Sequence, residues 1–230
     1  MTDRYLAGDP PIPLVLRRSA RAKRISLRIS QLDGRVTLTL PKRVPEREAL
    51  SFAREKEPWI RKHLSARLDD VVVARGATLP IGGEPHLVES GQGRRLSFAP
   101  GRVMVPGAPE RAGRILGRHL KEIARARLAE ASDHYADKLG RRYSAITLRD
   151  TRSRWGSCTA EGRLMYSWRL ILAPPQVLDY VAAHEVAHLA QMNHSPAFWA
   201  EVERIYGPYA TARAWLRREG SGLHRYRFDS

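Results

Sequence analysis

The stretch that most constrains the fold is HEVAHLAQMNH, residues 184–194, which holds three histidines and one glutamate. His184 and His188 are four residues apart, so their side chains share one face only if this part of the chain is helical. Two imidazoles that lie one helical turn apart are able to bind a single metal ion. The sequence therefore predicts a helix through this stretch, with both histidines directed toward one shared ligand.

Glu185 directly follows the first histidine, a placement that is typical of a general base acting on a metal-bound water. Zinc lowers the pKa of such a water to about 7, so that a carboxylate is able to take its proton. Catalytic zinc usually has three protein ligands. His194 is the candidate for the third, delivered by a turn where the helix ends near Asn193, because asparagine tolerates the left-handed conformation. Glu201 is the alternative third ligand.

The charge of the chain is strongly positive. Its 40 lysines and arginines exceed its 24 acidic residues, which leaves a net charge of +16. Such an excess favours anionic partners, above all nucleic acid, and a solvated basic surface is the alternative. The densest basic run is RRSARAKR, residues 17–24, which contains no acid. The absence of a long apolar run excludes a membrane span, and the single cysteine, Cys158, fits a reducing compartment, here the cytoplasm.

The first half of the chain has the pattern of a β-rich segment. Apolar and polar residues alternate in RISLRIS and RVTLTL on either side of Asp33-Gly34, which predicts a β-hairpin. A helix is expected after Pro45, with Pro58 breaking or kinking it. Short apolar runs cut by glycine and proline predict small strands over residues 71–106, and a long helix is expected over residues 110–139.

The second half repeats the order of strands and then helices. YSAITLRD, TRSRWGSC and GRLMYSWRLIL are expected to be strands, the last two joined by the turn TAEG at 159–162. A helix begins at Pro174-Pro175, and another begins at Ser195, whose side chain is expected to cap it. The last helix is expected to end at Gly220 and to leave a loose tail.

Taken together, these motifs resemble the YgjP-like, SprT-related family of zinc metallopeptidases, over most of residues 12–220. The resemblance rests on RSARAKRISLRI, TLPKRVPE, EKEPWIRKHL, SRWGSC, SWRLILAPPQVLDYVAAHEVAHLAQMNHSPAFW and the terminal helix around Trp215. It implies zinc ligands His184, His188 and His194, with Glu185 as the catalytic base of a gluzincin or minigluzincin. Related SprT-like proteases act on proteins crosslinked to DNA, a distant kinship that agrees with the basic charge.

The expected fold class is therefore α+β. Residues 1–108 are predicted to form an antiparallel β-rich segment with one helix. Residues 109–230 are predicted to form a small zincin-like catalytic domain with helices packed on a short antiparallel sheet. We expect a soluble enzyme with a protein or peptide substrate.

Several residues near the motif have two interpretations. Gly156 is expected to allow close approach of the backbone, and Cys158 to be a small buried residue rather than a metal ligand. An extended substrate is expected to pair with the strand GRLMYSWRLIL. Phe198 and Trp199 are expected to pack beneath the site, and Glu203 either to accept a hydrogen bond from a ligand or to be solvated. One of Arg152 and Arg154 is a candidate for stabilising an oxyanion, although a surface charge or a salt bridge to Asp150 or Asp179 is the favoured interpretation of these arginines. Tyr166 and Tyr180 are the other candidates.

The sequence predicts a zinc-dependent peptidase, in which Glu185 takes a proton from water and passes it to the leaving amine. Two other functions use the same residues. One is a nucleic-acid-binding protein with a structural zinc, and the other is a metal hydrolase that acts on a non-peptide bond.

Overall fold

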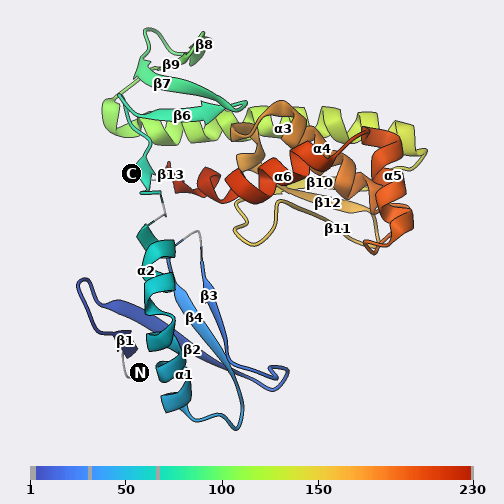
Figure 1. The fold of residues 1–230 in the computed structure, drawn as a ribbon. Helices are drawn as coiled ribbons and strands as arrows, with labels where there is room; N and C mark the ends of the chain where they lie inside the picture. Colours follow the sequence, from blue (N-terminus) through green and yellow to red (C-terminus); the bar gives the residue numbers. More distant parts are fainter. Residues whose placement is uncertain (1–3, 31–32, 66–67, 229–230) are drawn as a thin grey trace. The chain divides into compact units, whose positions relative to one another are not determined.

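The computed structural model describes residues 4–30, 33–65 and 68–228 of the chain. It has two compact units, residues 1–69 and residues 70–230 (Figure 1). The predicted boundary between residues 108 and 109 falls inside the second unit. The reason is that strands on the N-terminal side of this boundary bury Leu79, Val88 and Val103 in the same core as the long helix that follows it.

The first unit is a four-stranded sheet in the order β1-β2-β4-β3, covered by two helices. Its elements are β1 (Arg4–Leu6), β2 (Ile12–Ser19), β3 (Ser26–Ile29), β4 (Val36–Pro41), α1 (Glu46–Glu55) and α2 (Glu57–Ser65). The predicted hairpin is confirmed, because β3 and β4 pair antiparallel with Leu27 opposite Leu38. Gly34 forms its turn with a φ of 69°. The predicted helix is divided after Glu55, and Pro58 lies in the first turn of α2, where proline is tolerated.

The expectation of a purely antiparallel sheet in this segment is wrong. β2 and β4 pair parallel, with Leu14 opposite Val36 and Ser19 opposite Pro41. The reason is topological. β3 is an edge strand of the sheet, and β4 lies between β2 and β3. β4 is antiparallel to β3 and runs in the same direction as β2. Alternation along a strand predicts which residues share a face but not the direction of the neighbouring strand.

The second unit begins with a small mixed sheet in the order β6-β7-β9-β8. The elements of this part are β5 (Val71–Val72), β6 (Thr78–Ile81), β7 (Glu84–Ser90), β8 (Ser97–Ala99), β9 (Arg102–Val105), one 3-10 turn (Pro109–Arg111) and α3 (Ala112–Leu139). The predicted small strands and long helix are thus confirmed. α3 ends at Gly140, whose φ of 71° closes the helix in the left-handed conformation.

A three-stranded sheet and three helices follow α3. The elements are β10 (Ala145–Arg149), β11 (Gly156–Cys158), β12 (Arg163–Ser167), a 3-10 helix (Trp168–Leu172), α4 (Pro175–Ala187), α5 (Pro196–Tyr206), α6 (Ala210–Glu219), a second 3-10 helix (Gly220–Arg225) and β13 (Tyr226–Arg227). The sheet has the order β10-β12-β11. β11 and β12 are antiparallel as expected, whereas β10 and β12 are parallel, which corrects the prediction of an antiparallel sheet.

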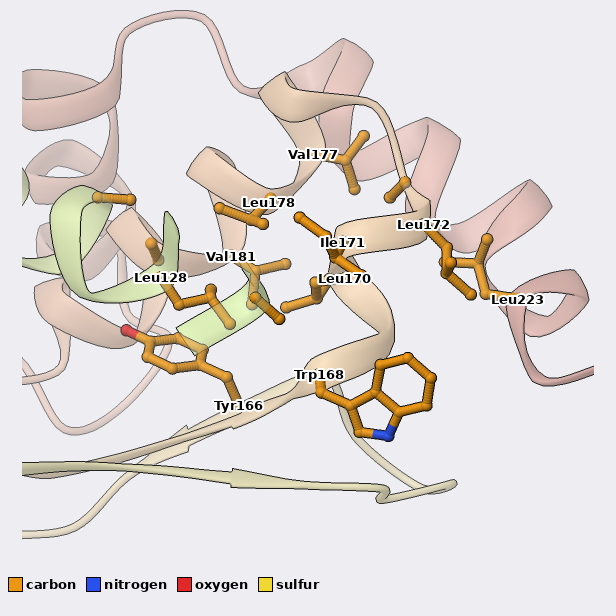
Figure 2. Packing of buried hydrophobic residues seen from close by; sticks show 14 of the residues in the cluster. Leu128, Tyr166, Trp168, Leu170, Ile171, Leu172, Val177, Leu178, Val181 and Leu223 are labelled. Atoms are coloured by element: carbon orange, nitrogen blue, oxygen red, sulfur yellow. The ribbon is translucent and has the colours of Figure 1, made fainter. Parts of the chain in front are cut away.

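The core of this part lies between α3, α4 and the sheet. Figure 2 shows Leu128 of α3, Tyr166 of β12 and Val181 of α4 directed toward one another and packed with Leu170. The segment WRLIL was expected to extend the strand, but it is a 3-10 helix in which every residue is buried. A strand with one solvated face would expose alternate residues of this run, so winding into a helix buries all of them.

Residues 220–228 pair and pack with the rest of the second unit, which corrects the expectation of a loose tail. Tyr226 and Arg227 pair parallel with Val71 and Val72, and Leu223 and Phe228 are buried in the core. The guanidinium of Arg169 secures this segment by donating to the carbonyl oxygens of Leu223 (3.0 Å) and Tyr226 (2.9 Å). Among the described residues, no helix is both long enough and apolar enough to cross a bilayer.

Candidate metal centre

Helix α4 carries the first two histidines of the motif. It begins at Pro175, after an extended Pro174, and nearly all of its later residues are buried. The helix ends at Ala187 with His188 as its cap, six residues before the predicted end at Asn193. His188 keeps helical dihedral angles, φ −63° and ψ −19°, so the four-residue spacing still places its side chain near that of His184. Their ring centroids are 5.1 Å apart.

The turn after α4 returns the chain to the two histidines. Leu189 and Ala190 donate backbone hydrogen bonds three residues back, which tightens the last turn. The carbonyl of Gln191 then accepts a hydrogen bond from Nδ1 of His188 at 2.9 Å. This bond leaves Nε2 of His188 as the nitrogen with a free lone pair.

His194 joins the other two histidines from the start of α5. Its Nε2 lies 3.0 Å from Nε2 of His184. One nitrogen from each of His184, His188 and His194 lies within 4.8 Å of the others, and this triad is the candidate metal group found among the described residues. Ser195 directly follows and caps α5 as predicted, because its hydroxyl accepts a hydrogen bond from the backbone N–H of Phe198. The cap holds the residue next to His194 in place.

The three histidines fit a divalent metal ion of the zinc class. Tetrahedral zinc bonds nitrogen at about 2.0–2.1 Å, which places two ligand atoms about 3.3 Å apart. The 3.0 Å between Nε2 of His184 and Nε2 of His194 is close to this value, and the nitrogen of His188 lies within 4.8 Å of both. Metal binding also requires neutral imidazole. Burial, followed by the neighbouring His188 and His194, lowers the pKa of His184 to about 3, and burial also lowers the pKa of His188. Both side chains are therefore neutral at physiological pH.

Glu185 lies on the side of α4 that faces strand β11. Its side chain is buried and occupies the space where Gly156 has no side chain. A Cβ placed on Gly156 would lie 2.5 Å from Cγ and 2.6 Å from Oε1 of Glu185. The sequence indicated that Gly156 allows a close approach of the backbone. The structure shows instead that a glycine is required here because the side chain of Glu185 fills the space. Burial raises the pKa of Glu185 to about 8, against the opposing charge of Arg154.

An aromatic floor supports the triad. Phe198 is fully buried, and its ring centroid lies 4.4 to 4.9 Å from those of His184, His188 and His194. Trp199 lies 5.6 Å from His184 and 5.7 Å from His194. The expectation that Phe198 and Trp199 pack beneath the site is thus confirmed.

The alternative ligands lie outside the triad. Glu201 accepts two hydrogen bonds from the guanidinium of Arg204, at 2.9 and 2.7 Å, and Glu203 is exposed. Cys158 is partly buried and donates to the carbonyl of Thr159, and burial together with Glu185 raises its pKa to about 11. A thiol in this state is protonated at neutral pH and is a poor metal ligand.

The candidates for an oxyanion stabiliser differ in their surroundings. Tyr166 is fully buried, and its hydroxyl hydrogen-bonds to Ser132 at 3.0 Å, so it is already engaged in the core. Tyr180 is nearer to the triad, with its ring centroid 5.9 Å from that of His184. Arg154 is exposed, and its charge acts on Glu185. The charge of Arg152 acts instead on His224, whose pKa it helps to lower.

Two neighbours of the triad were missed at the sequence level. Gln191 orients His188 through its backbone carbonyl, which has no side-chain signature. Arg213 of α6 lies over the ring of Trp199, 4.4 Å from its centroid, and its charge contributes to the low pKa of His184. A single arginine among 40 basic residues carries no signal that would distinguish it in the sequence.

Comparison with known proteins finds a matching family and a similar solved structure. The family described as "YgjP-like, metallopeptidase domain" matches residues 23–219. The crystal structure of the metallopeptidase zymogen of Pyrococcus abyssi abylysin is 22% identical to this chain. That alignment covers 43% of this chain and 97% of the other, with a TM-score of 0.37. No match was found among curated proteins.

Proposed function

The chain belongs to the YgjP-like family of metallopeptidases, and we propose that it is a zinc-dependent peptidase that uses a glutamate general base. The zinc ligands of this proposal are His184, His188 and His194, and the base is Glu185. The observation that carries it is the pairing of a three-histidine cluster with a buried glutamate for which Gly156 leaves space.

The roles of the residues follow from their surroundings. The imidazoles of His184 and His188 are neutral and present lone pairs to one point, and the hydrogen bond to Gln191 fixes the orientation of His188. Bound zinc would supply the Lewis acidity that makes water nucleophilic at neutral pH. Glu185 accepts the proton of that water on its carboxylate and delivers it to the leaving amine. Histidine ligands also bind other first-row metals, so metal content belongs in every assay.

The structure also changes which strand a substrate would pair with. β12, in the segment GRLMYSWRLIL, is the central strand and is hydrogen-bonded on both sides. β11 is the edge strand of this sheet, and its first residue, Gly156, contacts Glu185. We therefore assign substrate pairing to β11, where an extended peptide adds to the free edge beside the base.

The first of the two other functions, a nucleic-acid-binding protein with a structural zinc, differs from this proposal in what Glu185 does. A structural zinc site is closed by four protein ligands and has no use for a buried carboxylate beside them. The described residues offer three histidines, which leaves a position for water. A hydrolase for a non-peptide bond would use the same groups, so a panel of ester, phosphate and peptide substrates separates it from a peptidase.

The direct test is the variant Glu185→Gln, compared with Glu203→Gln on the exposed surface of α5. Glu185→Gln is expected to keep one zinc per chain and to lose hydrolysis of casein or of a peptide library by about 100-fold or more. Glu203→Gln removes the same charge and is expected to change neither property. An unchanged rate in Glu185→Gln would exclude it as the base, and hydrolysis confined to non-peptide substrates would refute the peptidase proposal.

A further inference from the structure

The densest basic run of the sequence lies in the first unit, whereas the residues of the metal centre belong to the second. Between Asp9 and Asp33 the chain has no acidic residue, and it has none between Asp33 and Glu46. We define the basic rim as the seven exposed cations of these stretches that lie on or beside one end of the sheet: Arg17, Arg21, Lys23, Arg24, Arg28, Lys42 and Arg43.

The strand register brings the members of the basic rim together. The carboxyl ends of the parallel strands β2 and β4 meet, because Ser19 pairs with Pro41. The start of β3 reaches the same end, because Ser26 pairs with Thr39. The loop between β2 and β3, with Arg21, Lys23 and Arg24, therefore leaves the sheet at the same end as the segment with Lys42 and Arg43.

Arg18 fixes these two segments to each other. Its Nη1 donates to the carbonyl oxygens of Lys42 at 2.8 Å and of Val44 at 2.9 Å. The guanidinium of Arg18 is thus used within the fold. Among the described residues of the first unit, the ion pairs use cations that lie outside the basic rim: Arg4, Arg35, Lys56 and Arg61. The charges of the basic rim are thus held close together without internal neutralisation.

The open face of the sheet continues this surface. Helices α1 and α2 cover one face, where Leu14, Leu38 and Leu27 are packed (Figure 1). On the other face Arg17 and Ser26 flank Thr39, and one row further along Val15 and Arg28 flank Thr37. Apart from Val15, the side chains of these two rows are guanidinium and hydroxyl groups, which contact phosphate oxygens in nucleic acids.

The composition of this face favours a duplex over a single strand or a membrane. Single-stranded nucleic acids are bound by several aromatic side chains on which bases stack. Among the described residues, the exposed aromatic on this face is Tyr5, which pairs with Pro13, about 13 Å along β2 from Arg17. A membrane-binding face carries many apolar side chains among its cations. Here the exposed aliphatic side chain among the cations is Val15, and Ser26, Thr37 and Thr39 lie between the arginines.

We propose that the basic rim and the open face of the first unit bind double-helical nucleic acid through its phosphate backbone, without reading its sequence. This proposal is independent of the peptidase chemistry, because it uses no residue of the metal centre.

The test measures binding of the full chain to a labelled 20-base-pair DNA duplex by fluorescence anisotropy at several salt concentrations. Each neutralised phosphate contributes about −0.9 to the slope of log affinity against log salt. With five of the seven cations engaged, the slope is about −4.5, and affinity falls about 500-fold between 50 and 200 mM salt. The double variant Arg17→Gln/Arg28→Gln removes two phosphate contacts, so its affinity is expected to fall by only about 40-fold over the same range of salt.

The matched control is Arg47→Gln/Arg54→Gln. It removes two exposed arginines from α1, which covers the opposite face of the sheet, and changes the net charge by the same amount. Equal effects of the two double variants would show general charge attraction and overturn the proposal. It would also be overturned by preference for single-stranded DNA, phosphatidylserine vesicles or polyglutamate over the duplex. Binding of a duplex RNA with the same slope supports it, because the recognised group is the phosphate backbone.

Discussion

Replacing Gly156 by alanine is expected to disable hydrolysis without removing the metal. The new Cβ would lie 2.5 Å from Cγ of Glu185, whereas carbon atoms in contact prefer about 3.5–4.0 Å. The glutamate side chain therefore has to move by about 1 Å. A displacement of about 1 Å in a reacting group costs about 100-fold in rate, which is about 2.7 kcal/mol of activation free energy.

The assay compares kcat on a fluorogenic peptide, zinc content and urea unfolding for Gly156→Ala and Gly222→Ala. Gly222 is the matched control, because no atom lies within 4 Å of a Cβ placed there and its φ is outside the left-handed region. Overpacking at Gly156 is expected to cost about 1–3 kcal/mol of unfolding free energy, with zinc retained. Gly222→Ala is expected to match the parent protein in all three measurements.

A double variant isolates the cause. If Gly156→Ala acts through the glutamate, it is expected to slow the enzyme little when Glu185 has already been changed to glutamine, because groups that act as a unit are not additive. Full activity in Gly156→Ala would refute the assignment of Gly156 as the residue that makes room for the base. So would a loss of zinc as large as the loss of rate.

Three further outcomes test other parts of the structure. His194→Ala is expected to lose zinc during dialysis against a weak chelator, whereas Glu201→Gln is expected to retain one zinc per chain; the reverse result would make Glu201 the third ligand. Arg169→Met leaves two backbone carbonyls without a donor and is expected to lower the unfolding free energy by about 2–4 kcal/mol in urea. Burial raises the pKa of Asp150, but hydrogen bonds and the charge of Arg169 lower it more, so its folded pKa is below the usual value. The Asp150–Arg169 ion pair therefore stabilises the folded state above about pH 4, and this stabilisation is lost as pH falls through the folded pKa of Asp150. The decrease in unfolding free energy at acidic pH is therefore expected to be smaller in Arg169→Met than in the parent protein. An identical pH profile would exclude the Asp150–Arg169 pair as a source of that decrease.

The elements predicted well are those whose evidence is local. The hairpin of β3 and β4 follows from period-two alternation around Asp33-Gly34, and α3 follows from helical spacing. The spacing of His184 and His188 predicts a shared face with no knowledge of the rest of the chain. The capping role of Ser195 is likewise contained in SPAF.

The corrected elements depend on contacts between distant residues. The parallel pairing of β2 with β4, and of β10 with β12, depends on where an intervening strand is placed. The segment WRLIL has a strand-like composition, yet it is helical because the core against α3 buries all five of its side chains. Tertiary packing outweighs a local propensity of a few tenths of a kcal/mol per residue.

The chemical groups of the candidate site can be read from the order of residues alone: two histidines on one helical face, a glutamate beside the first, and a third histidine close behind. The tertiary structure alone decided how these groups are completed. Gln191 orients His188 only because the helix ends at Ala187, and Gly156 makes room for Glu185 only because β11 packs against α4. Spacing within one helix follows from the rise and twist of the backbone. A contact between residues 29 positions apart in the chain depends on how the whole core closes, and no short pattern encodes it.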